Sequence, residues 1–143
     1  METATGSVRK RTGWIWAICL FYLISAGWTI LATALVYSGS APLNAAQRAY
    51  FASLSSFDIG FSILLGSLNL LGALMLFILN RMAFNLFATA FGISLLLTFW
   101  HAATKGWLQA IGATGIVGYL LGVSLSAAIC FYSWKLIKRG TLV

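Results

Sequence analysis

The chain has 143 residues, of which 61% are hydrophobic and 8% are charged, and its mean hydropathy is +0.94. Soluble globular domains carry about 25% charged residues, so this composition excludes a soluble enzyme and a soluble binding domain. The formal net charge of +7 would suggest a nucleic-acid partner in a soluble protein. Here the basic residues flank apolar stretches, so we attribute the charge to membrane topology and expect no nucleic-acid partner.

Four apolar stretches, at about 14–37, 57–79, 82–103 and 108–134, are each long enough to cross a bilayer. A hydrocarbon core of ~30 Å needs ~20 helical residues at a rise of ~1.5 Å each. The second, third and fourth stretches are joined by short links, which favour antiparallel neighbours. We therefore expect an all-α integral membrane protein with one domain over 1–143, an antiparallel up-down-up-down bundle of four transmembrane helices.

The basic residues predict the orientation of these helices. If the N-terminal tail, 1–12, is cytoplasmic, seven of the nine basic residues lie on the cytoplasmic side, with the C-terminal tail, 135–143, among them. Those seven are Arg9, Lys10, Arg11, Arg81, Lys135, Lys138 and Arg139, against Arg48 and Lys105 on the outer side. Lys and Arg are enriched in cytoplasmic flanks, so we expect both termini in the cytoplasm of a bacterium and the helices in its inner membrane.

The first stretch also resembles a signal peptide, because a basic run precedes it and small residues stand at 32–34. However, the apolar part before those small residues runs from 14 to 31. Cleaved signal peptides have apolar regions of about 7 to 15 residues. We therefore expect a first helix that is retained.

The outer loop, 38–56, contains a short helix signal. Asn44 is followed by Gln47 three positions on, as in a capping box. From there Ala46, Tyr50, Leu54 and Phe57 recur at helical spacing. We expect a short amphipathic helix on the outer face of the membrane that the four helices cross. It either seals the mouth of the bundle or forms a lid or docking surface.

The second stretch carries a polar stripe on one helix face. Its members, Asp58, Ser62, Leu65, Asn69, Gly72 and Leu76, advance by alternating steps of four and three. A polar group in lipid without a partner is costly, so this stripe should face protein or water. The mid-membrane amide of Asn69 suits two roles: hydrogen bonding that holds helices together, or a place on a substrate or ion path.

The third stretch offers a matching face with Ala90, Ser94, Thr98 and His101. The hairpin between the second and third stretches brings Asp58 and His101 to a comparable depth. They form either a structural pair at the interface or a pH-sensitive ion pair or cation site. The candidate polar or ion site therefore consists of Asp58, Ser62, Asn69, Ser94, Thr98 and His101.

The fourth stretch has small residues at four-residue intervals. They are Thr114, Gly118, Gly122 and Ser126, with Cys130 one step further. Small residues at this interval let helix backbones approach closely, so this face predicts helix packing or oligomerisation. Its partner is either the first helix, which offers Ser25, Thr29 and Thr33, or another subunit.

The two cysteines, Cys19 and Cys130, lie at similar depths near the cytoplasmic side. They are either small packing residues or a thiol pair or soft-metal site. We expect packing, because no second pair of ligands stands nearby. We accordingly predict no metal site and no cofactor.

The sequence contains no nucleophile elbow, phosphate-binding loop, paired-cysteine motif or cluster of carboxylates. One His and one acidic residue near the spans are too few for a two-carboxylate or triad mechanism. We therefore expect a non-enzymatic accessory, assembly or scaffolding subunit of a membrane complex, or a self-associating module. Its partners are the lipid bilayer and other membrane subunits or itself. The alternative is a small oligomeric channel or transporter with Asp58, Asn69 and His101 along its route.

Overall fold

The computed structural model describes residues 13–142, and these form five helices. They are α1 (Gly13–Tyr37), α2 (Ala45–Ser53), α3 (Ser56–Phe77), α4 (Met82–Thr104) and α5 (Trp107–Lys138). The four longer helices are long and apolar enough to cross a membrane, as predicted. The basic run Arg9 to Arg11 and the rest of the tail 1–12 lie outside the described residues.

Two helices end at other residues than the approximate ends that the sequence predicted. α5 continues to Lys138, four residues past the predicted end, since basic residues are favourable in the last turn of a helix. α3 ends at Phe77, and the chain turns through Leu79, which has a positive φ of 62°.

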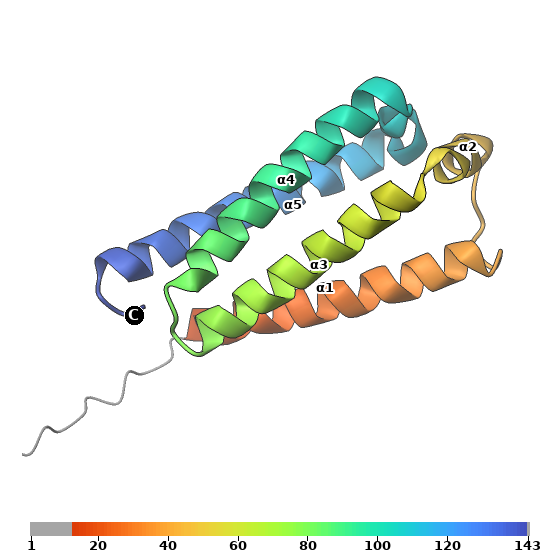
Figure 1. Cartoon of the computed structure of the whole chain (residues 1–143). Coiled ribbons are helices and arrows are strands. Elements are labelled where there is room, and N and C mark those ends of the chain that lie inside the picture. The colour runs from red at the N-terminus through yellow and green to blue at the C-terminus, as the bar shows by residue number, and fades with distance from the viewer. Residues whose placement is uncertain (1–12, 143) are drawn as a thin grey trace, which may run out of the picture.

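The helices pack in the spatial order α1, α3, α4 and α5, and α2 lies against α5 (Figure 1). At one end of the molecule α1 begins, α3 turns into α4, and α5 ends. We call this the basic end, because four basic residues lie there: Arg81, Lys135, Lys138 and Arg139. α2 and the turn from α4 to α5 lie at the opposite end, which we call the α2 end (Figure 1).

The buried core lies toward the basic end. The ring of Phe87 on α4 is 2% exposed and stacks on Tyr22 of α1 at 5.3 Å between centroids. Phe87 also meets Gly72 of α3, where a Cβ atom would lie 2.9 Å from the Phe87 ring. The absence of a side chain at Gly72 therefore allows α3 and α4 to approach closely.

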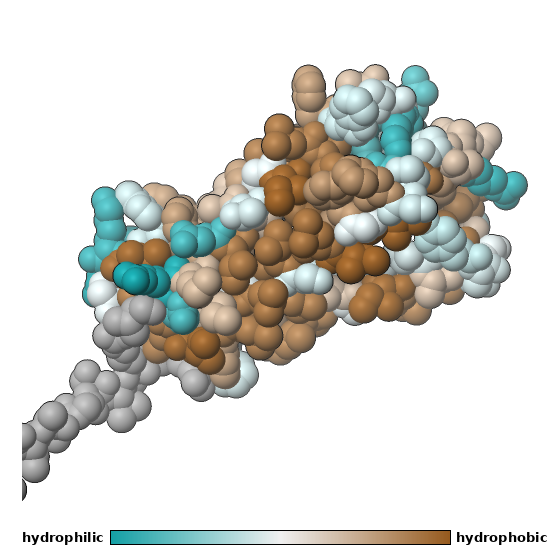
Figure 2. All heavy atoms as spheres, in the orientation of Figure 1, coloured by the Kyte–Doolittle hydropathy of each residue, from teal (hydrophilic) through white to brown (hydrophobic). Residues whose placement is uncertain are grey.

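The outer surface of the long helices is apolar. Leu96 and Phe99 on α4 are 73% and 77% exposed, and Trp28 on α1 is 69% exposed. On the face shown in Figure 2, apolar residues cover the middle of the molecule and polar residues gather toward its two ends. Water would disfavour this large exposed apolar surface, whereas the hydrocarbon core of a bilayer accommodates it.

The short helix α2 begins where the sequence predicts. Asn44 accepts a hydrogen bond from the Gln47 amide at 2.8 Å, and the Gln47 side chain accepts from the Asn44 amide at 3.0 Å. The predicted apolar face of this helix is wrong at its far end. α2 stops at Ser53, the chain turns, and Phe57 belongs to α3, where it is 71% exposed.

α5 is not a straight helix. Gly112, one turn after its start, has φ 63° and ψ −176°, outside the helical region. Glycine reaches this conformation without the strain that a Cβ atom would cause. The first turn of α5 is therefore set at an angle to the rest, next to the turn at Gly106, which also has a positive φ of 61°.

Candidate functional site

A cluster of polar side chains at the α2 end joins α2, α3 and α4. We call it the Asp58 cluster, and its members are Tyr50, Ser55, Asp58, His101 and Lys105. A capping box at the start of α3 sets the position of the central carboxylate. Ser55 is the N-cap of α3, and its backbone amide and hydroxyl both donate to Asp58 Oδ2 at 2.7 Å. This capping box fixes the Asp58 carboxylate at the start of the helix.

Two side chains from the end of α4 complete the surroundings of the carboxylate. His101 Nε2 lies 3.0 Å from Oδ1, and Lys105 Nζ donates to Oδ2. Asp58 is only 6% exposed, so its charge is balanced by partners from the protein itself. Charge-assisted hydrogen bonds of this kind are shorter and stronger than neutral ones.

Tyr50 extends this network to α2. Its hydroxyl lies 3.1 Å from Nδ1 of His101. Burial, and secondly the charge of Asp58, raise the pKa of Tyr50, so the phenol keeps its proton. With a neutral His101, the network assigns the Tyr50 hydroxyl as donor to Nδ1 and Nε2–H as donor to Asp58.

Lys105 makes a second contact with α2. Its Nζ atom donates to the backbone carbonyl of Ser53 at 3.1 Å, the last residue of that helix. The ammonium group thus satisfies an orphan carbonyl at the helix end while it pairs with Asp58. The cluster therefore holds three helix ends together.

The structure brings together only part of the predicted polar site. Asp58 and His101 meet directly, as the hairpin argument predicts. Ser62 is exposed, and its hydroxyl donates to the Asp58 carbonyl of its own helix at 3.0 Å, so it is not part of the Asp58 cluster. Thr98 is half-buried on α4 and makes no hydrogen bond to the Asp58 cluster.

The remaining predicted residues, Asn69 and Ser94, lie deeper, at a cavity of about 290 Å³ between α1, α3, α4 and α5. We call it the central cavity. Its other polar lining residues are Tyr22, Ser25, Tyr119, Ser126 and Cys130. Within residues 13–142 the Asn69 amide makes no side-chain hydrogen bond, so the predicted role of Asn69 in holding helices together has no observed partner.

Sequence reasoning missed Tyr50, Ser55 and Lys105 as members of the cluster. Two signals were present. Ser55 and Asp58 have the spacing of a capping box, and His101 and Lys105 are four residues apart, which places both on one face of a helix end.

The small-residue face of α5 is not filled by α1. Thr114, Gly118 and Gly122 are exposed, and a Cβ built on either glycine meets no described atom within 4 Å apart from its chain neighbours and the nearby backbone of α5. The hydroxyls of Thr29 and Thr33 on α1 donate to carbonyls of their own helix at 2.8 and 2.7 Å. Ser126 is half-buried, and Gly122 and Ser126 both line the central cavity.

The two cysteines are free and pack against the buried core. Cys19 donates to the Ala73 carbonyl at 3.2 Å, which ties α1 to α3. Among residues 13–142, no three side chains of His, Cys, Asp or Glu lie close enough together to hold a metal ion.

Comparison with protein-family models, with curated proteins and with solved structures finds no match to this chain.

Proposed function

We propose that this chain is a non-enzymatic integral membrane protein that acts by helix association within the bilayer. It serves as a self-associating module or as an accessory, assembly or scaffolding subunit of a membrane complex. The observation that carries this proposal is the open space over Gly118 and Gly122 on α5. These two glycines lie four residues apart on a part of α5 that no other described helix fills, and Gly122 also lines the open central cavity.

The chemistry of a bilayer favours a helix as the partner for this surface. Lipid tails are as apolar as leucine, so helices associate through close packing and hydrogen bonds rather than by leaving water. Thr114 is exposed one turn before Gly118 and provides a hydroxyl at the same face. A second copy of the chain offers the identical surface, and a two-fold pairing would match glycine to glycine.

Mass measurement after gentle detergent extraction tests this proposal. We expect the unmodified protein to run as a dimer or larger assembly. Gly118→Leu and Gly122→Leu should shift it toward the monomer, because the added side chains hold the backbones apart. The matched control is Gly92→Leu on α4, which also has open space over its Cβ position. A monomer under all conditions would overturn the proposal.

We further propose that the four spans alternate in direction, with both termini in the cytoplasm of a bacterium and the helices in its inner membrane. The charge distribution supports this orientation, because Arg81, Lys135, Lys138 and Arg139 share the basic end. A reporter active on one side of the membrane, fused to each terminus in turn, tests it. Opposite results at the two ends would contradict an even number of crossings.

The second candidate function is a small oligomeric channel or transporter. The central cavity favours it, because Asn69 and Ser94 place polar groups within the membrane-spanning part of the chain. A route from the α2 end would pass Asp58 and His101, which are held by Lys105 and Tyr50. Flux into liposomes that disappears in Asn69→Leu would support this function, and flux equal to that of empty liposomes would exclude it.

A further inference from the structure

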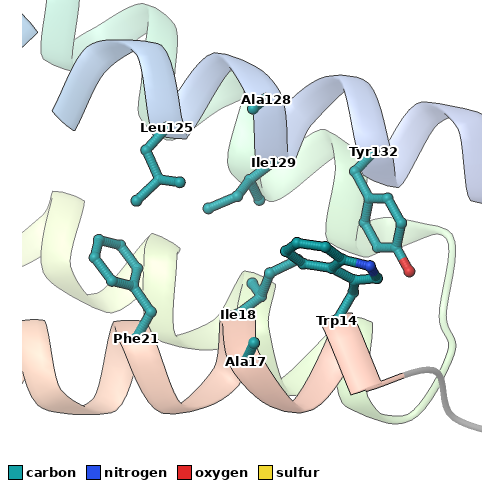
Figure 3. Close-up of a pocket in the computed structure, with 8 residues that line it drawn as sticks. All are labelled: Trp14, Ala17, Ile18, Phe21, Leu125, Ala128, Ile129 and Tyr132. Atoms are coloured by element: carbon teal, nitrogen blue, oxygen red, sulfur yellow. The ribbon is translucent and has the colours of Figure 1, made fainter. Parts of the chain in front are cut away.

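A groove runs between α1 and α5 close to the basic end, and Figure 3 shows side chains of the two helices pointing toward each other across it. Its volume is about 430 Å³, within the range of roughly 300–1,000 Å³ that is usual for ligand sites. It exists because α1 packs on α3 and α5 packs on α4, which leaves these two helices apart.

The groove has a buried apolar floor and exposed apolar rims. Ile18 and Ile129 form the floor and are 8% and 4% exposed. Trp14 and Phe21 on α1 and Leu125 on α5 form the rims and are 69%, 42% and 42% exposed. In a bilayer an acyl chain would fill such an apolar groove, because an empty groove would forfeit dispersion contacts.

The dimensions suit one acyl chain of a single leaflet. From Trp14 to Phe21 the groove follows α1 for about 10 Å at ~1.5 Å per residue. One leaflet of a hydrocarbon core is ~15 Å deep. At the basic end the groove finishes at Trp14 and Tyr132, and Figure 3 shows the Tyr132 hydroxyl at that end. Such amphipathic rings settle at the level of lipid headgroups.

Positive charge continues from the groove along α5. Tyr132 and Lys135 on α5 and Arg139, the residue directly after its end, follow one another at steps of three and four, so they lie on one side of the helix end. Lys135 and Arg139 are exposed, and neither forms a salt bridge within residues 13–142. The neighbouring Lys138 is different, since its ammonium lies 3.9 Å from the centre of the Trp134 ring.

We propose that this groove binds an anionic phospholipid, with one acyl chain between α1 and α5 and the phosphate headgroup at Lys135 and Arg139. The apolar floor selects a hydrocarbon chain, and the two cations select a headgroup with net negative charge over a zwitterionic one. Basic pockets between transmembrane helices bind anionic headgroups in this way. The site lies between α1 and the C-terminal part of α5, and it does not depend on association through Gly118 and Gly122.

Native mass spectrometry tests the proposal on the full chain released from vesicles with equal amounts of phosphatidylglycerol and phosphatidylethanolamine that carry the same acyl chains. We expect the protein to retain phosphatidylglycerol preferentially, by about five-fold for each contributing cation. The double variant that combines Lys135→Gln and Arg139→Gln should remove the preference for phosphatidylglycerol. Arg81→Gln is the matched control, because Arg81 lies at the same end but on the turn between α3 and α4, and it should leave the preference unchanged.

A second pair of variants tests whether an acyl chain lies in the groove. Ala128→Phe fills the groove and should reduce retention of both lipids at least several-fold. Ala127→Phe adds the same ring to an exposed neighbour that does not line the groove, and should have no effect. Equal retention of the two lipids by the unmodified protein would overturn the proposal. An equal loss of the phosphatidylglycerol preference in Arg81→Gln would also overturn it, as would unchanged lipid retention in Ala128→Phe. A second copy of the chain cross-linked across the groove would overturn it too, because protein would then fill the groove in place of lipid.

Discussion

The Nε2 atom of His101 lies 3.0 Å from Oδ1 of Asp58 and joins the last turn of α4 to the first turn of α3. The other ring nitrogen of His101 meets the Tyr50 hydroxyl, so one imidazole connects three helices. α2 has no buried residue of its own. The position of this short helix at the α2 end therefore depends on polar contacts more than on apolar burial.

The first prediction concerns the ion pair of this cluster. Asp58→Asn and Lys105→Gln should each lower the thermal unfolding midpoint in detergent, because each leaves a partly buried charge without its partner. The double variant should lose clearly less than the sum of the two single losses, since it leaves neither charge unpaired. Ser62→Ala is the control, because that hydroxyl bonds only within its own helix. Strictly additive losses would contradict the proposed coupling.

The second prediction concerns pH. Burial, and then the charge of Asp58, raise the pKa of Tyr50 in the folded protein above the value of about 10 that tyrosine has in an unfolded chain. The stabilisation from Tyr50 is therefore fully present below about pH 10 and is lost as the pH rises through its folded pKa. As the pH rises above about 10, Tyr50→Phe should therefore lose less thermal stability than the unmodified protein.

The control for this pH experiment is Tyr37→Phe, because Tyr37 is 63% exposed at the end of α1. The thermal stability of Tyr37→Phe should fall with rising pH as steeply as that of the unmodified protein. A steep fall that is unchanged in Tyr50→Phe would show that Tyr50 does not contribute to the alkaline transition.

The third prediction concerns the close contact of α3 with α4. Gly72→Ala places a methyl group 2.9 Å from the buried ring of Phe87, which is itself stacked on Tyr22. Overpacking of this kind costs about 1–3 kcal/mol of unfolding free energy. Gly66→Ala lies on the same helix with open space over its Cβ position, so it should be neutral or stabilising by about 0.5–1 kcal/mol. Equal effects of the two variants would contradict the packing described here.

Local features of the sequence predicted the helices well. Span length and hydropathy placed the four long helices, and the Asn44 capping box placed the start of α2. These features depend on neighbouring residues only. The break between α2 and α3 was harder to predict, because Phe57 continues the apolar spacing of α2 although a second capping box at Ser55 starts a new helix there.

Features that depend on contacts between helices were predicted in part. Depth alone paired Asp58 with His101. Lys105 was predicted only as a basic residue on the outer side, and the fold brings its ammonium to Asp58. The separation of α1 from α5 follows from which neighbours each helix packs on, and the spacing of small residues on α5 does not reveal it. The same spacing fits a partner within the chain and a partner outside it.

The most direct test of helix association is disulfide cross-linking in native membranes. In a background in which Cys19 and Cys130 are replaced by Ala, a cysteine introduced at position 118 lies on the exposed face of α5. We expect Gly118→Cys to form a cross-linked dimer under mild oxidation, whereas Gly92→Cys, on the exposed side of α4, stays monomeric. Absence of the dimer in Gly118→Cys, or equal dimer formation in both variants, would contradict association through this face.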